Sequence, residues 1–153
     1  EKLYEQGYRG VIFDIDNTLV PHGAPADERA KRLFQRLREI GFESCLLFNN
    51  QKKRVEMFNQ EIQTHYIYNA LKPARKNYLH AMEIMGTDQA NTLFVGDQLF
   101  TDVWGAKRVG IHNILVHPIN PKEEIQIVLK RYLEKIVLHF YKKSKKRLKK
   151  VAN

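Results

Sequence analysis

Two aspartates near the start of the chain have the type and spacing of a reactive site. Asp14 and Asp16 lie in the stretch FDIDNTL, residues 13–19, directly after an apolar run. Alternation along an extended chain would point both side chains to the same side. Because two like charges this close raise each other's pKa unless a cation intervenes, the pair indicates a site that needs negative charge.

Further polar residues that could share this site occur at three later places in the chain. They are the pair Asn49-Asn50, the lysine Lys72 before a proline, and Asp97 with Asp102 in GDQLFTD. Several carboxylates together suit Mg²⁺, which prefers an octahedron of oxygen ligands and typically binds with a phosphate. The sequence lacks zinc-type Cys and His spacing, a Walker-type glycine loop and a nucleophile elbow. These residues therefore favour a divalent cation with a phosphorylated ligand.

Alternating strand-like and helix-like segments must position these residues. Strands are predicted at 10–15, 44–48, 66–68, 91–96 and 113–116. Helices are predicted at 27–40, 52–62, 74–85 and 101–110, with a long one from about 121 to 141. This order predicts an α/β fold, a Rossmann-like three-layer sandwich with a mostly parallel sheet. In such sheets ligands bind beyond the carboxyl ends of the strands, where the polar residues are expected.

The motifs DxDxT, an asparagine after the second strand, a lysine and GDxxxTD occur here in that order. This order resembles the haloacid dehalogenase (HAD) superfamily of phosphatases over about residues 9–120. The stretch GDQLFTDVWGAKRVGIHNILVHPI is similar to the capless subfamily IIIA, in a bacterial branch related to phosphatidylglycerophosphate phosphatases. The resemblance implies a HAD-like fold without a sizeable cap domain and a phosphoric monoester hydrolase. An open site suits a large or membrane-borne phosphomonoester, since a small metabolite would be poorly shielded from water.

The resemblance also implies the catalytic roles. Asp14 would be the nucleophile that forms an aspartyl-phosphate, and Asp16 would be the general acid and base. Lys72 would draw charge from the phosphoryl group. Mg²⁺ would be held by the Asp14 carboxylate, the Asp16 main-chain carbonyl and Asp97, while Asp102 would support the metal waters or Lys72.

The resemblance further implies that Thr18 braces the turn and that Thr18, Asn49 and Asn50 bind substrate. The family usually has Ser or Thr before the asparagine, whereas this chain has Phe48 there. Loss of one preorganised donor can cost on the order of 10²–10³ in rate. Two hypotheses stay open, an active Mg²⁺-dependent phosphatase and a weakly active or non-catalytic module that binds membrane or nucleic acid.

The charge of the chain is concentrated at its C-terminal end. The net charge is +9, but residues 142–150 hold seven of the 26 Lys and Arg, and the remaining 19 face 17 acids, a net of +2. The sequence therefore predicts a basic tail at 142–153, and the resemblance implies that 1–141 is a HAD-like phosphatase domain. Segment 121–150 could be a core-packing helix with a solvated basic end, or an amphipathic anchor on an anionic membrane surface. Nucleic-acid binding is the least favoured reading, because aromatics are few and no motif occurs.

The remaining features predict a cytoplasmic protein, with a peripheral position at the inner face of the membrane as a further expectation. The printed sequence shows neither a signal peptide nor an apolar run long enough to span a bilayer. Its one cysteine, Cys45, lies in an apolar run and is expected to be a buried thiol without a disulfide partner. The histidines show no ligand spacing and are expected to be non-catalytic; they are His22, His65, His80, His112, His117 and His139.

Overall fold

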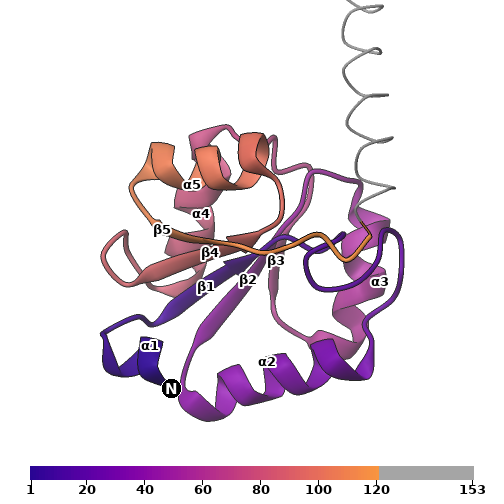
Figure 1. Ribbon diagram of the computed structural model, residues 1–153, viewed down its shortest axis with the longest axis horizontal. Coiled ribbons are helices and arrows are strands. Elements are labelled where there is room, and N and C mark those ends of the chain that lie inside the picture. The colour runs from indigo at the N-terminus through magenta and orange to yellow at the C-terminus, as the bar shows by residue number, and fades with distance from the viewer. Residues whose placement is uncertain (121–153) are drawn as a thin grey trace, which may run out of the picture. The chain divides into compact units, whose positions relative to one another are not determined.

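The computed structural model of the chain describes residues 1–120 (Figure 1). Residues Glu1–Ile119 form one compact unit. The predicted long helix, the expected boundary after residue 141 and the basic tail lie outside the described residues.

Five parallel strands form one sheet in the order β3-β2-β1-β4-β5. The strands are β1 (Gly10–Phe13), β2 (Glu43–Leu47), β3 (His65–Ile67), β4 (Thr92–Gly96) and β5 (His112–Leu115). In the centre of the sheet, Ile12 lies opposite Cys45 on one side and Phe94 on the other. The predicted Rossmann-like sheet is therefore confirmed.

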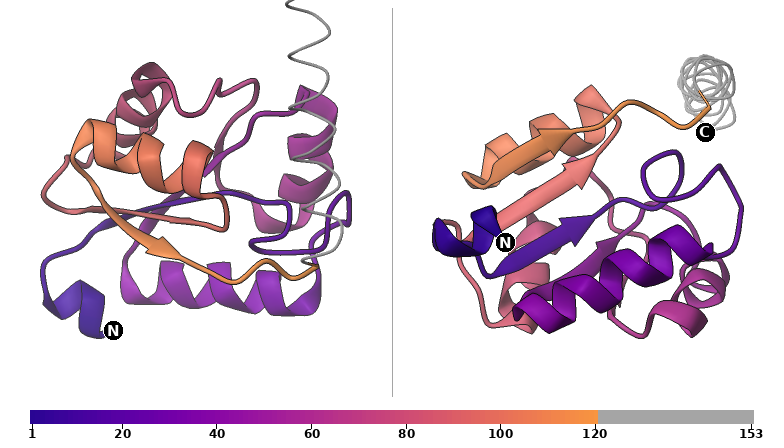
Figure 2. Two further views of the ribbon diagram at one scale, coloured as in Figure 1. Left: turned by 45° about the horizontal axis from the view of Figure 1, so that its top comes forward. Right: turned by 60° about the horizontal axis from the view of Figure 1, so that its bottom comes forward.

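Helices cover both faces of the sheet and produce three layers (Figure 2). They are α2 (Glu28–Ile40) and α3 (Lys52–Ile62) on one face, and α4 (Arg75–Met85) and α5 (Trp104–Val109) on the other. A short helix that the sequence did not predict, α1 (Lys2–Glu5), precedes β1. A π-helical turn, η1 (Leu99–Val103), leads directly into α5.

The side chains of β1 alternate between two buried clusters, one on each face. Phe13 packs on Phe34 of α2, with ring centroids 5.2 Å apart. Ile12 points to the opposite cluster, which contains Tyr78 of α4. Because β1 is buried on both faces, it has an unbroken apolar sequence instead of a polar alternation.

Local signals set the ends of the helices as predicted. The Asp27 side chain caps α2 by accepting a hydrogen bond of 2.7 Å from the Ala30 N–H. Gly41 and Gly86, which end α2 and α4, have φ values of 99° and 64°, in the left-handed region that favours glycine. Because all five strands are parallel, their carboxyl ends lie at one edge of the sheet.

The first strand is shorter than predicted, and this changes the direction of the acids that follow. β1 ends at Phe13, and the chain then turns, with the Asn17 N–H bonded to the Val20 carbonyl and Asn17 at a φ of 62°. The expectation that extended alternation points Asp14 and Asp16 to the same side was therefore wrong.

No separate cap is formed within residues 1–120. The segment between β1 and α2 buries Ile15 and Leu19 in the same cluster as β1, and α3 buries Val55 there too. Both places that could hold a cap therefore contribute to the main core. This agrees with the expectation of a domain without a sizeable cap.

Two smaller expectations concern Cys45 and membrane spans. Cys45 is fully buried, and burial raises the pKa of its thiol to about 12, which confirms the buried cysteine. Across residues 1–120, none of the helices has the length and apolar character needed to cross a bilayer.

Candidate active site

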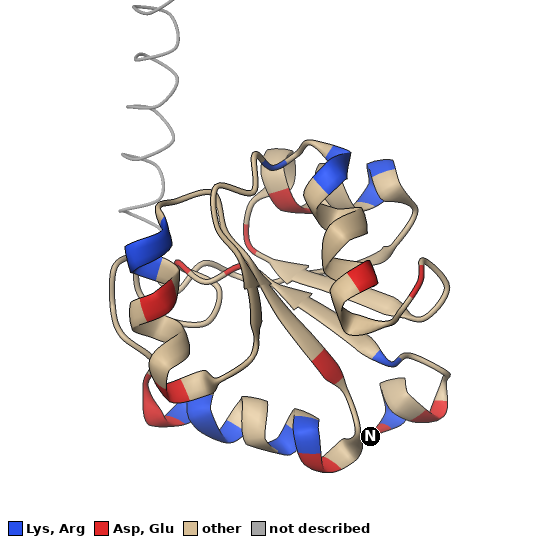
Figure 3. Cartoon of the chain, turned by 180° about the vertical axis from the view of Figure 1, so that it is seen from behind, with Lys and Arg blue, Asp and Glu red and all other residues tan. Residues whose placement is uncertain are grey.

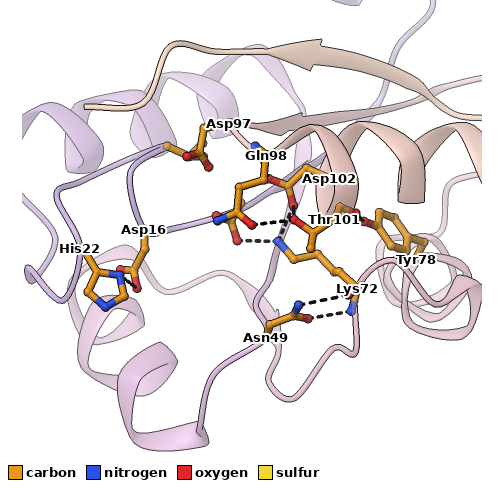
Figure 4. A network of polar contacts seen from close by, with 11 residues as sticks. Asp16, His22, Asn49, Lys72, Tyr78, Asp97, Gln98, Thr101 and Asp102 are labelled. Atoms are coloured by element: carbon orange, nitrogen blue, oxygen red, sulfur yellow. Dashed lines mark hydrogen bonds and ion pairs between the residues drawn. The ribbon is translucent and has the colours of Figure 1, made fainter. Parts of the chain in front are cut away.

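Lys72 lies between two buried carboxylates at the carboxyl edge of the sheet (Figure 4). Its Nζ is 2.5 Å from Asp14 Oδ1 and 2.7 Å from Asp102 Oδ1. Asp14 follows β1, Lys72 follows β3 and Asp102 belongs to η1. The topology therefore brings together three residues that the sequence placed far apart.

Asn49 fixes the main chain of Lys72 (Figure 4). Its Oδ1 accepts a hydrogen bond of 2.7 Å from the Lys72 N–H, and its Nδ2 donates one of 3.2 Å to the Lys72 carbonyl. The amide of Asn49 thus orients the lysine, which is a different task from the expected contact with substrate. That Asn49 also binds substrate, through atoms outside these two hydrogen bonds, stays a prediction.

The pKa values of Lys72 and Asp14 depend on the burial of both side chains. Burial raises the pKa of Asp14 to about 7; Lys72 opposes this shift, while the charges of Asp102 and Asp97 add to it. Burial alone would lower the pKa of Lys72, but the carboxylates of Asp102 and Asp14 more than offset it and raise that pKa. Lys72 is therefore held as a cation, and negative charge on Asp14 is costly without a further cation.

Three buried carboxylates are grouped closely enough to hold a metal ion. Oxygen atoms of Asp14, Asp97 and Asp102 all lie within 4.8 Å of one another. Thr18 Oγ1 donates a hydrogen bond of 2.9 Å to Asp97 Oδ1, so Thr18 orients one of these acids. A buried donor set made only of carboxylate oxygens fits a hard cation such as Mg²⁺.

Both carboxylate oxygens of Asp102 accept hydrogen bonds. Besides Lys72, its Oδ2 accepts a hydrogen bond of 3.1 Å from the Gln98 N–H, and its Oδ1 accepts a longer one of 3.4 Å from Thr101 Oγ1. It is fully buried and packs directly against Gly96, where an added Cβ would collide with its carboxylate. Of the two support roles expected for Asp102, the contacts favour the one on Lys72.

Asp16 points away from this group and has its own partners. Arg54 donates two hydrogen bonds to its Oδ1, of 2.7 Å from Nη2 and 3.2 Å from Nε. The Gly23 N–H donates a third, of 3.1 Å, to the same oxygen, and His22 Nδ1 lies 3.0 Å from Oδ2 (Figure 4). The carboxylate of Asp16 is thus not among the three grouped acids of residues 1–120, which leaves its main-chain carbonyl as the expected metal contact.

The sequence did not identify Arg54 or the position of His22. The one signal for Arg54 was its place next to Val55, a residue predicted to face inward on α3. Its guanidinium is largely buried and lies 5.9 Å from the ring centroids of both Phe48 and Phe58. His22, expected to be non-catalytic, contacts a proposed acid, but the structure gives it no further role.

Phe48 continues the alternation of β2 into the core. Its side chain is buried in the cluster that includes Val55 and Phe58, and its N–H donates to the Ile67 carbonyl. Asn50 is half-buried, and its carbonyl accepts from the Asn69 N–H. Phe48, which stands where the family usually has Ser or Thr, thus packs in the core next to the Arg54 guanidinium.

Comparisons with known proteins agree with this geometry. A family model described as HAD-hydrolase-like matches residues 69–118. "Probable phosphatase YqeG" of Bacillus subtilis is 35% identical over 144 residues, which cover 94% of this chain and 84% of that protein. The chain belongs to the haloacid dehalogenase superfamily of phosphatases. The predicted enzyme class, a phosphoric monoester hydrolase, is thereby confirmed.

Two further proteins are similar to this HAD-superfamily chain at lower sequence identity. "Phosphatidylglycerophosphate phosphatase 1, chloroplastic/mitochondrial" of Arabidopsis thaliana is 27% identical over 88% of this chain, which spans only 44% of that protein. A solved HAD phosphatase from Thermococcus onnurineus has a TM-score of 0.54 at 18% identity, covering 71% of this chain and 86% of the other. At this identity the structural likeness establishes the fold.

Proposed function

We propose that the protein is a Mg²⁺-dependent phosphomonoester hydrolase that works through an aspartyl-phosphate on Asp14. The observation that carries the proposal is the buried Asp14 carboxylate, 2.5 Å from Lys72 and grouped with Asp97 and Asp102. Burying several carboxylates close together is costly without enough positive charge to compensate them, so this arrangement is best explained by a cation and an anionic substrate that complete the site.

In the first half-reaction, a carboxylate oxygen of Asp14 attacks the phosphorus and the ester P–O bond breaks. The Asp16 carboxyl donates a proton to the leaving oxygen. Lys72 stabilises the negative charge on the phosphoryl oxygens, and its burial strengthens that interaction. Asn49 holds the main chain of Lys72, and Asp102 holds its ammonium group.

In the second half-reaction, Asp16 takes a proton from a water molecule, whose oxygen attacks the phosphorus of the aspartyl-phosphate. The bond to Asp14 breaks, and inorganic phosphate and the free carboxylate are released. Asp14, Asp97 and the main-chain carbonyl of Asp16 would hold Mg²⁺, which neutralises charge on the phosphoryl group when bound. Arg54 donates two hydrogen bonds to the Asp16 carboxylate and so orients it.

The proposed substrate is phosphatidylglycerophosphate or another large or membrane-borne phosphomonoester. The absence of a cap within residues 1–120 supports an open site, and the Arabidopsis relative carries that substrate in its name. A cytoplasmic protein at the inner face of an anionic membrane is part of this proposal. The expected anchor, residues 121–150, lies outside the described residues.

Hydrolysis of p-nitrophenyl phosphate with and without Mg²⁺ tests the chemistry. We expect Mg²⁺-dependent turnover that Asp14→Asn removes and that Asp88→Asn, an exposed control, retains. Trapping phosphate on Asp14 by rapid acid quench would support the covalent step. If the parent and Asp14→Asn show no Mg²⁺-dependent difference in hydrolysis, the result would instead favour the alternative, a weakly active or non-catalytic module that binds membrane or nucleic acid.

A further inference from the structure

Exposed apolar side chains occur in the loop after β3, in η1 and at the start of α5. This apolar rim consists of Leu71, Leu99, Phe100 and Trp104, which are 72%, 58%, 81% and 52% exposed. Exposed apolar side chains that stand singly are normal, but several in one place mark an interaction surface. The apolar rim is therefore a candidate surface for binding another molecule or a membrane.

The loop after β3 lies beside η1 and α5, next to the proposed active site. Lys72, which follows Leu71, is bonded to Asp102 of η1. Arg108 Nη1 also donates a hydrogen bond of 3.1 Å to the carbonyl of Pro73, which joins the same loop to α5. The apolar rim thus borders the place where a phosphorylated group would enter.

Basic residues also lie at the carboxyl edge of the sheet. They occupy the first turns of two helices, where the helix dipole disfavours positive charge. Lys53 is exposed in the first turn of α3, and Arg75 and Lys76 are exposed in the first turn of α4. Neither first turn contains an acid, although the helix dipole favours acids there. Figure 3 shows the basic first turn of α3. We call these three residues the basic rim; Lys52, beside it, is already paired with Glu56 at 3.3 Å.

We infer that the apolar and basic rims together dock the catalytic edge of the sheet on an anionic lipid bilayer. The apolar rim enters the interface while the basic rim meets the anionic headgroups. Docking in this orientation presents a lipid phosphomonoester to Lys72 and Asp14 without extracting it from the membrane. This choice of substrate rests on the proposed function, whereas docking itself can be measured without turnover.

The composition of the apolar rim favours lipid over nucleic acid. Two of its four members are leucines, which offer no ring for base stacking. The ring of Trp104 is covered by the Arg108 guanidinium, 5.1 Å from the ring centroid. A tryptophan flanked by a cation and aliphatic side chains matches the chemistry of a membrane interface.

Trp104 makes the inference directly testable, because it is the single tryptophan of the chain. The full chain is mixed with vesicles of phosphatidylcholine alone or of phosphatidylcholine with phosphatidylglycerol. With the anionic vesicles we expect a blue shift of the emission and quenching by brominated acyl chains. Vesicle binding without any change at Trp104 would place the contact elsewhere on the chain, such as its basic C-terminal segment, and would overturn the inference.

Matched variants identify the surface. Leu99→Ser with Phe100→Ser is expected to weaken vesicle binding by about tenfold or more, and Arg75→Gln by about fivefold. Leu33→Ser, which removes a 39% exposed leucine from α2, is expected to change nothing. Unchanged binding of the double variant, or a blue shift that needs no vesicles and rises with protein concentration, would contradict membrane docking.

A soluble substrate separates this inference from the proposed function. The Leu99→Ser, Phe100→Ser variant is expected to hydrolyse p-nitrophenyl phosphate like the parent, which shows that its fold is intact. If the parent docks but hydrolyses nothing, the proposed function fails and docking stands. If the parent hydrolyses the soluble substrate but Trp104 is not quenched, docking fails and the phosphatase stands.

Discussion

Arg54 donates two hydrogen bonds to a single carboxylate oxygen of Asp16, of 2.7 Å from Nη2 and 3.2 Å from Nε. The two residues come from α3 and from the turn after β1, and the guanidinium is largely buried. Arg54 is therefore a positioning residue for the proposed general acid, and it defines how Asp16 can face a substrate.

Arg54→Ala is expected to reduce turnover most for substrates whose leaving group needs a proton. An alkyl phosphate should lose about a hundredfold in kcat/KM. For p-nitrophenyl phosphate the loss should be much smaller, because nitrophenolate leaves without protonation. Arg54→Lys should recover part of the loss, and Lys53→Ala should match the parent with both soluble substrates. Equal losses for the two substrates would show that Arg54 serves only the fold.

Gly96→Ala is expected to reduce activity by displacing Asp102, which positions Lys72, although the substitution leaves the lysine itself unchanged. A Cβ at this position would collide with the carboxylate of Asp102, which is fully buried and holds Lys72 at 2.7 Å. We expect kcat to fall by about a hundredfold, as for small misplacements of catalytic groups. Asp102→Asn should give a similar loss, and the double variant should lose little more, because both act on one contact. Additive losses in steady-state kinetics would contradict this coupling.

Phe48→Ser is expected to destabilise the protein without improving catalysis. The ring is buried in the core cluster on the α2 and α3 face, so its removal should cost about 3–5 kcal/mol in the free energy of unfolding, measured by urea denaturation. Phe48→Leu should cost less, because most of the volume is kept. A tenfold rise in kcat/KM for Phe48→Ser would mean that a hydroxyl at this position does reach the substrate.

Mg²⁺ is expected to stabilise the fold, and to do so more strongly as pH rises. Burial raises the pKa of Asp14 from 3.8 to about 7, so the metal-free folded protein keeps a proton that the unfolded chain has lost. That contribution to stability is complete below about pH 4 and is lost as the pH rises through about 7. Because Mg²⁺ must displace this proton, its affinity should increase over the same range.

Thermal denaturation at about pH 6 and about pH 8 checks this expectation. At a hundredfold excess of Mg²⁺ over its Kd the stabilisation should reach about 2.7 kcal/mol. Asp97→Asn should reduce the shift at both pH values, and Asp14→Asn should remove its pH dependence. A Mg²⁺ shift that is larger at the lower pH would argue against Asp14 as a ligand.

The parts of the fold that depend on local patterns could be predicted from the sequence. The alternation of strands and helices, the helix ends at Gly41 and Gly86 and the polar residues at the strand ends were all readable. The end of β1 at Phe13 was not, because it depends on a turn whose hydrogen bonds involve Asn17 and Val20. The second carboxylate was therefore expected on the wrong side.

The partners within the site were harder to predict because they depend on tertiary contacts. Lys72 and Asp14 are 58 positions apart, and only the order of known motifs linked them. Arg54 and Asp16 are 38 positions apart and belong to no motif that the sequence analysis used. The two hydrogen bonds between the Asn49 side chain and the Lys72 main chain could not be predicted from hydrophobic periodicity either. Periodicity indicates which face of a helix or strand is buried, but not which residues it contacts.

The strand order also decides when during synthesis the enzyme can become active. β1 pairs with β4, where Gly10 lies opposite Thr92, so the centre of the sheet joins an early segment to a late one. A nascent chain that has left the ribosome only through α4 holds its proposed nucleophile but lacks Asp97 and Asp102, which come later. Catalysis in the cell must therefore begin after translation has passed η1, and regain of turnover during refolding reports the pairing of β4 with the central strand β1.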